Sequence, residues 1–231
     1  MPKFLTRPAA EAYGHAIGVI LPDRPFPAVI GDIAHAATFE APALYRITDG
    51  SLDSSAKVAI ELAAQGVESI AGAWGTMEQQ LALAGQLDVP VCFSALVQLP
   101  MIAAAIGESR VIGIISTRSE QDLRMDLQMT NFSVQRAPIV LSLERAPGFC
   151  CAYGSLGGTL AVKAVQDEVT ELAARICTPN TAVGAILLDG SVLSPYSHEV
   201  RNKFDVHVFD LLTAIQCVSS ATLQTQYAGL F

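Results

Sequence analysis

The stretch AIGVI at residues 16–20 returns as VIGII at residues 111–115, and this repeat decides the fold. Each copy is a short run of mostly apolar, β-branched residues, which is typical of a fully buried strand. Two more pairs of short matches keep the same order: SIAG at 69–72 with AILL at 185–188, and DVPV at 88–91 with DVHV at 205–208. Chance matching of short strings is the alternative, but the preserved order favours a duplicated architecture.

Helical segments separate these strands. The clearest is at residues 159–176, where apolar side chains recur at spacings of three and four. Further helices are expected at 54–65, 77–87, 96–106, 119–129, 196–203 and 210–220, and further strands near 43–47 and 133–136. Strands that alternate with helices predict parallel sheets with helices on both faces.

We therefore expect an α/β protein of two pseudo-symmetric, doubly wound lobes. The first lobe covers residues 1–108 and the second covers residues 109–208, and a C-terminal helix within 209–231 packs back on the first lobe. Ligand loops follow the carboxyl ends of parallel strands. Two facing lobes would place those loops on opposite sides of one cleft.

Composition narrows the class of protein. The chain has 231 residues, 51% hydrophobic and 16% charged, so it can bury a sizeable core. Its net charge of -8 argues against a nucleic-acid partner, which would need clustered Lys and Arg. The apolar runs are too short to span a membrane, and the N-terminus does not resemble a signal peptide. Five irregularly spaced cysteines favour the cytoplasm, and no ligand-spaced cluster predicts a metal.

Two irregular stretches are rich in proline, glycine and turn residues. The first runs from residue 22 to 53 and the second from 146 to 158, and we expect a long loop in each. Loops of such length in a compact domain are often functional. Neither contains a phosphate-binding glycine motif.

The order of these motifs is similar to that of the aspartate/glutamate racemase superfamily. GVESIAGAWGT at 66–76 resembles the family's first strand-and-turn segment, and VPVCFSALVQLP at 89–100 resembles the strand and helix after it. GAILLDGSVLSPY at 184–196 resembles the second such segment, and VFDLLT at 208–213 the closing junction. The superfamily includes amino-acid and hydantoin racemases, maleate isomerases and arylmalonate decarboxylases.

The resemblance implies chemistry at a carbon next to a carboxylate, without a cofactor. In this family one cysteine removes the Cα proton and a second returns it from the opposite face. Trp74 stands at the first cysteine position and Gly190 at the second, and neither side chain can carry a proton. Trp74 could fill or stack in the cleft, or be a core residue at a strand end.

The resemblance also implies a carboxylate site at the two turns. The hydroxyls of Thr76 and Ser191, with the backbone of Gly75, Ser191 and the adjacent Val192, are the candidate donors. Ordinary capping of the next helix is the alternative for both hydroxyls. Further candidates for substrate contact are Ser94, Gln98 and Tyr196.

Several other residues could replace the missing bases. Asp189 is expected to be structural, because it points away from Gly190 along the strand. A single histidine such as His198 is more often a surface residue. Cys92 lies in a buried strand, where cysteine behaves as a small hydrophobe. Cys150 and Cys151 lie in the second irregular stretch, with only Arg145 near enough in sequence to lower a thiol pKa.

We expect a divergent racemase-like protein that binds a small carboxylate between its lobes. Racemase, isomerase or decarboxylase chemistry is one interpretation, a non-catalytic small-acid-binding pseudoenzyme is the second, and a structural or assembly role is the third. A homo-oligomer is compatible with the fold, but no feature of the sequence fixes the state of association.

Overall fold

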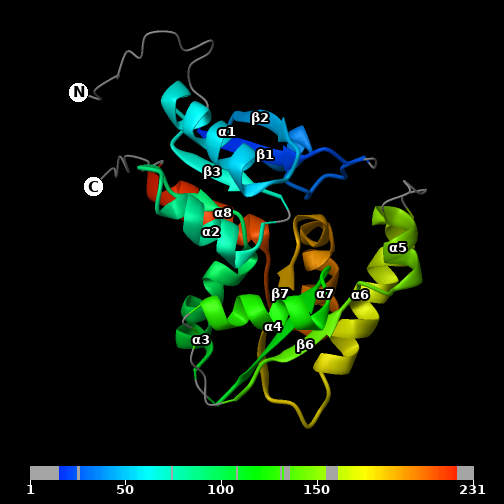
Figure 1. Cartoon of the computed structure of the whole chain (residues 1–231). Coiled ribbons are helices and arrows are strands. Elements are labelled where there is room, and N and C mark those ends of the chain that lie inside the picture. The colour runs from blue at the N-terminus through cyan, green and yellow to red at the C-terminus, as the bar shows by residue number, and fades with distance from the viewer. Residues whose placement is uncertain are drawn as a thin grey trace, which may run out of the picture.

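The computed structural model describes residues 16–24, 27–73, 75–107, 109–130, 132, 136–154 and 161–222 (Figure 1). Within these ranges the strands form two sheets of four parallel strands each. The first sheet has the order β2-β1-β3-β4 and the second has the order β6-β5-β7-β8. Their strands are β1 (Ile17–Pro22), β2 (Ala43–Thr48), β3 (Ser69–Gly72) and β4 (Val91–Cys92), then β5 (Val111–Ser116), β6 (Ile139–Ser142), β7 (Val183–Asp189) and β8 (His207–Phe209).

The two sheets repeat one topology. The duplicated stretches at 16–20 and 111–115 fall on β1 and β5, and the other two matches fall on β3 with β7 and on β4 with β8. In each sheet the equivalent strands take the same places in the order. The expected α/β fold with two pseudo-symmetric lobes is therefore confirmed.

Helices surround both sheets, and α8 belongs in space to the first one. It contacts β3 and β4, and the hydroxyls of Ser219 and Ser69 are 3.2 Å apart. The α-helices are α1 (Leu52–Gln65), α2 (Met77–Ala84), α3 (Leu99–Ile106), α4 (Glu120–Met129), α5 (Pro147–Tyr153), α6 (Val162–Ile176), α7 (Ser197–Phe204) and α8 (Leu211–Thr222). In the part of the chain that the structure describes, three 3-10 helices accompany them: η1 (Ala36–Thr38), η2 (Ala95–Gln98) and η3 (Ser191–Tyr196).

One of the clusters of buried hydrophobic side chains spans both lobes. A single cluster of buried side chains contains Val19 and Leu96 from the first lobe together with Ile114 and Leu187 from the second. A loop of the first lobe also packs on η3, because a Cβ at Gly31 would lie 2.9 Å from the Cα of Pro195. These contacts fix the two sets of strand ends relative to each other.

The second irregular stretch is not a loop over most of its length, because residues 147–153 form α5. Pro147 opens the helix, and the Glu168 carboxylate on α6 accepts the N–H groups of Gly148 at 2.6 Å and Phe149 at 2.7 Å. This cap comes from a residue distant in sequence, so local composition did not predict the helix. Residues 155–160 lie outside the described residues.

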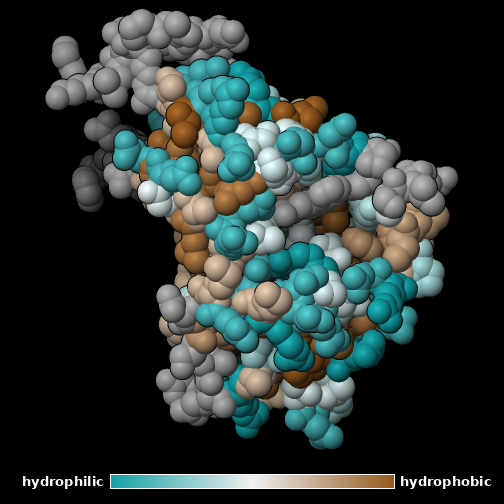
Figure 2. All heavy atoms as spheres, in the orientation of Figure 1, coloured by the Kyte–Doolittle hydropathy of each residue, from teal (hydrophilic) through white to brown (hydrophobic). Residues whose placement is uncertain are grey.

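One expected strand also lies elsewhere. The fourth strand of the second sheet is β6 at Ile139–Ser142, beyond the expected 133–136, of which 133–135 lie outside the described residues. The face in Figure 2 is mostly hydrophilic over α4 and α6. No helix among the described residues is long and apolar enough to cross a membrane.

Candidate functional site

A cavity of about 310 Å³ lies between the lobes, at the carboxyl ends of the central strands. The first lobe contributes the turn after β3 and the start of η2, and the second contributes the turns after β5 and β7, with α5 along one side. The lining residues are Gly75, Phe93, Ala95, Thr117, Arg118, Phe149, Tyr153, Asp189, Gly190, Ser191, Val192 and Leu211. This volume suits a small organic molecule.

Arg118 is the positively charged side chain among the described lining residues. Its guanidinium lies 2.6 Å from an Asp126 oxygen and 3.0 Å from an Asp189 oxygen. Burial disfavours its charge, but Asp189 and Asp126 outweigh that effect and raise the Arg118 pKa. Asp189 is fixed in turn by the Ser116 hydroxyl at 2.7 Å. Arg118 is therefore a preorganised positive charge held by two carboxylates.

In the first lobe's half of the expected carboxylate site, groups at the start of α2 already have hydrogen-bond partners within the protein. Asp126, from the second lobe, accepts the N–H of Met77 at 2.9 Å, at the start of α2. The Thr76 hydroxyl accepts the N–H of Gln79 at 3.2 Å, and the Gln79 side chain accepts the N–H of Thr76 at 3.3 Å. Thr76 is thus a helix cap, and an internal carboxylate occupies the position next to it. Gly75 remains in the cavity lining.

The second lobe's half is open. Gly190, Ser191 and Val192 line the cavity together. The Ser191 hydroxyl is fully buried and has no hydrogen-bond partner among the described residues, and the same holds for Ser194 three residues later. A buried hydroxyl without a hydrogen-bond partner costs free energy.

Ser94, Gln98 and Tyr196 do not line this cavity, and each has a partner within the protein. Ser94 caps η2 by accepting the N–H of Leu96 at 3.3 Å. Gln98 connects the first lobe to the residue before α8, since its amide donates to the Asp210 carbonyl at 2.8 Å. The Tyr196 hydroxyl lies 3.1 Å from that of Tyr153, and burial raises its pKa.

Of the two positions at which the resembled family has cysteines, the structure describes only Gly190. Trp74 lies outside the described residues. Gly190 has a φ of 140°, in the region that glycine favours, and it begins η3 at the cavity wall. A side chain there would meet Thr117, so the glycine is more than the loss of a reactive group.

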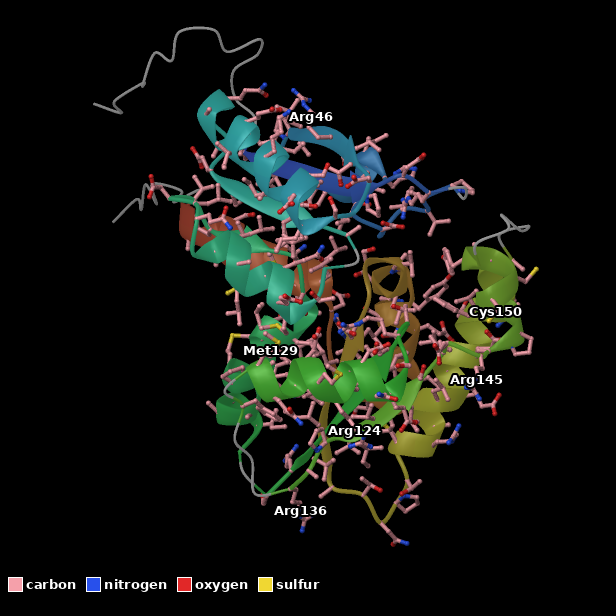
Figure 3. The ribbon with its side chains drawn as sticks, viewed as in Figure 1. Arg46, Arg124, Met129, Arg136, Arg145 and Cys150 are labelled. Atoms are coloured by element: carbon pink, nitrogen blue, oxygen red, sulfur yellow. The ribbon has the colours of Figure 1, made fainter. Side chains whose placement is uncertain are left out.

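The other candidate bases are spread over the molecule. Cys92 is buried, and burial, with the nearby Cys217, raises its pKa to about 12. Cys150 and Cys151 are exposed on α5, where Figure 3 shows Cys150 at the outer edge. His198 contacts Asn202 in an exposed part of α7. Asp189 was expected to be structural, and it both anchors Arg118 and lines the cavity.

Sequence reasoning missed Thr117, Arg118, Phe149 and Tyr153. Thr117 and Arg118 directly follow β5, and the rule that strand ends carry ligand residues could have indicated them. Phe149 and Tyr153 belong to α5, whose helix was not predicted.

The described lining residues offer little acid–base chemistry. They include no thiol and no imidazole. Burial raises the Tyr153 pKa, as does its hydrogen bond to Tyr196, so this phenol is a poor base at neutral pH. Asp189 is engaged by Arg118 and Ser116. Among the described residues no group of three metal-binding side chains is found. The arrangement is suited to holding a ligand.

The fold is similar to that of several solved structures. Allantoin racemase from Pseudomonas fluorescens superposes with a TM-score of 0.59 at 15% identity, covering 89% of both chains. Unliganded arylmalonate decarboxylase superposes with a TM-score of 0.56 at 15% identity, covering 92% of this chain and 94% of its own. The chain thus has the fold of the aspartate/glutamate racemase superfamily, which confirms the resemblance at that level.

The sequence is also similar to that of several lyases. Dimethylsulfoniopropionate lyase 7 of Emiliania huxleyi is 27% identical over 93% of this chain and 69% of its own length. Dimethylsulfoniopropionate lyase 3 of the same organism is 25% identical over 93% of this chain, which spans 62% of the lyase. A scan of protein-family profiles finds no match.

Proposed function

We propose that the cavity between the lobes binds a small organic carboxylate. The observation that carries this is the buried Ser191 hydroxyl, which has no hydrogen-bond partner among the described residues and belongs to the same cavity wall as Arg118. The two ion pairs of Arg118 use one hydrogen bond from each of two nitrogens. Because a guanidinium has five N–H donors, donors remain for a ligand. Ser191 and Arg118, which both belong to the second lobe, then bind the carboxylate of the ligand.

The rest of the lining supports a ligand that also carries a positive charge. Phe93, Phe149 and Tyr153 place three aromatic rings around the cavity, and such rings attract a desolvated cation. Arg118 is paired with both Asp189 and Asp126, so this cluster carries one net negative charge, which favours a ligand that also has a positive charge. The similar lyases are named for dimethylsulfoniopropionate, a compound with a sulfonium group and a carboxylate.

Isothermal titration calorimetry with two matched probes tests this proposal. One probe is 3-dimethylsulfoniopropionate and the other is 4-methylpentanoate, which has the same shape with carbon in place of the cationic sulfur. The proposal predicts 1:1 binding of both, with the sulfonium probe bound more tightly by about 3–30-fold, the size of a cation–π contribution. Absence of binding by either probe at millimolar concentrations contradicts the proposal.

Lyase chemistry is the second candidate, favoured by the match of the lyases over 93% of this chain. Elimination from the sulfonium probe would break the C–S bond, release dimethyl sulfide, leave acrylate and deliver the α proton to a base. The described lining offers only Asp189 and Tyr153 for that role. Gas chromatography of dimethyl sulfide and NMR of α-deuterium exchange in D2O decide between turnover and binding alone.

A further inference from the structure

The Asp126 carboxylate, on α4 of the second lobe, bridges the two lobes beside the cavity. One of its oxygens accepts the N–H of Met77 at 2.9 Å, at the start of α2 in the first lobe. The same oxygen accepts the Arg118 guanidinium at 2.6 Å. Arg118 lines the cavity, and so does Gly75, two residues before Met77. The buried Asp126 carboxylate is therefore separated from the cavity by a single guanidinium.

This carboxylate stands where an external anion would otherwise meet the same two partners. A carboxylate is stabilised both by the first turn of a helix and by an arginine, and Asp126 has both contacts. The N–H groups of Thr76 and Gln79 are also satisfied, because each pairs with the side chain of the other residue. A ligand carboxylate that approached Met77 and Arg118 together would have to displace Asp126.

The balance of charge points the same way. Arg118 already faces two buried carboxylates, those of Asp126 and Asp189. A ligand with one carboxylate adds a third negative group near this single cation, and a ligand with two adds a fourth. Repulsion between like charges is stronger in a partly buried site than in water. Each further carboxylate on the ligand is therefore disfavoured by Asp126.

We propose that Asp126 is a specificity-determining residue that restricts the cavity to ligands with a single carboxylate. It does so by occupying the position between α2 and Arg118 and by adding a negative charge next to the cavity. The identity of the ligand rests on the proposed function. The occupation of this position by the Asp126 carboxylate stands on the geometry alone.

The charge selection is tested by calorimetry with two probes that differ by one carboxylate. One is 4-methylpentanoate, and the other is isobutylmalonate, which carries a second carboxylate on the carbon next to the first. The original protein should bind isobutylmalonate at least about 10-fold more weakly. Asp126→Asn keeps the shape of the side chain and removes its charge, and it should reduce the ratio of the two dissociation constants by about 10-fold or more.

Asp122→Asn is the matched control, because it removes one charge from an exposed part of the same helix. It should leave the ratio within about 3-fold of the original value, since solvent and salt screen an exposed charge. Equal binding of both probes by the original protein overturns the proposal without the use of any variant. Equal ratios in Asp126→Asn and the original protein overturn it as well.

The occupied position is tested without the proposed ligand. Asp126→Ala removes the carboxylate from Met77 and Arg118, and acetate can then take its place. Sodium acetate, compared with sodium chloride at the same ionic strength, should raise the melting temperature of Asp126→Ala by at least about 3 °C more than that of the original protein. Equal rises in the two proteins overturn the occupation of this position by Asp126.

The two failures are distinguishable. If the original protein binds neither 4-methylpentanoate nor 3-dimethylsulfoniopropionate, the proposed function fails and the selection by Asp126 fails with it, while the acetate experiment still decides the occupied position. If the original protein binds 4-methylpentanoate and isobutylmalonate equally well, the proposed function stands and only the role of Asp126 fails.

Discussion

Arg118 is the residue on which the cavity wall depends most. Asp126 and Asp189 are both buried, and removing the guanidinium would leave two carboxylates without their cation. Breaking such a pair is costly because the remaining charge stays desolvated. The same cation is also the proposed anchor for the ligand.

Arg118→Ala should therefore lower the free energy of unfolding by about 3 kcal/mol, measured by urea denaturation. The control is Arg124→Ala on the outer face of α4 (Figure 3), where the ion pair with Glu120 is exposed and 3.8 Å long. That change should cost less than about 1 kcal/mol. Equal losses of unfolding free energy in the two variants would show that the buried ion pairs of Arg118 stabilise the protein no more than the exposed pair does.

The two unpaired serines lead to the opposite expectation for stability. Ser191→Ala and Ser194→Ala each remove a buried hydroxyl that has no partner among the described residues. Each variant should gain up to about 1 kcal/mol in urea denaturation. A loss in either would mean that its hydroxyl has a partner, such as a bound water.

Cys92 should be chemically silent in the folded protein. Its thiol is buried, and its pKa is raised to about 12, so very little thiolate exists at pH 8. Brief treatment with iodoacetamide should label the exposed Cys150 and Cys151 and leave Cys92 unmodified until urea is added. Peptide mass spectrometry gives the result, and rapid native labelling of Cys92 would contradict its assigned burial.

At the scale of elements, α5 lines the cavity but depends on contacts with α6 for its position. A helix of seven residues is not stable alone. Its first N–H groups depend on the Glu168 carboxylate, and its residues Phe149 and Tyr153 form the aromatic side of the cavity. The position of this side therefore depends on α6.

Glu168→Ala should release α5 at a cost of about 1–2 kcal/mol, the usual range for a lost helix cap. Hydrogen–deuterium exchange should accelerate over residues 147–153, and binding of 3-dimethylsulfoniopropionate should weaken. Glu171→Ala on the exposed face of α6 is the matched control and should change neither. Unchanged exchange in Glu168→Ala would remove Glu168 from this role.

The same elements show what a sequence can predict. β1 and β5 were predictable because a buried parallel strand needs a continuous apolar run, and that pattern is local. α5 was not, because its cap lies twenty residues away on α6. The resemblance pointed to the turns at Thr76 and at Gly190 alike, whereas the contact of Asp126 with the turn at Thr76 comes from the other lobe, which no local motif reveals.

At the scale of the whole molecule, a polar network joins the lobes beside the shared core. The Gln98 amide donates to the Asp210 carbonyl and accepts the Thr213 hydroxyl at 2.9 Å. The Asp210 carboxylate accepts the Ser197 hydroxyl and, at 2.9 Å, the N–H of Thr213. Gln98, predicted to contact substrate, thus connects the first lobe to the start of α8.

This network should give a pH-dependent contribution to stability. Burial raises the Asp210 pKa, although the hydrogen bonds from Ser197 and Thr213 partly lower it. Because the folded pKa exceeds the unfolded one, the stabilising contribution is complete below about pH 3.9, the unfolded value, and is lost as pH rises through the folded pKa. Asp210→Asn lacks this titration.

The stability of Asp210→Asn relative to the original protein should therefore increase as the pH is raised from about 4 to 7. Urea denaturation of both proteins at matched pH values measures the difference, and contributions from all other groups cancel. A difference that stays constant over this range would show that the Asp210 pKa is not raised on folding.

The central claim is that the open half of the cavity, at Ser191, receives a small carboxylate. The most direct measurement is calorimetric titration of 4-methylpentanoate into Ser191→Ala and Ser194→Ala. Each variant loses one buried η3 hydroxyl that has no partner among the described residues, and the two positions are three residues apart. The account predicts that Ser191→Ala binds about 10-fold more weakly than the original protein and that Ser194→Ala binds equally well. Equal affinity in all three proteins would contradict it.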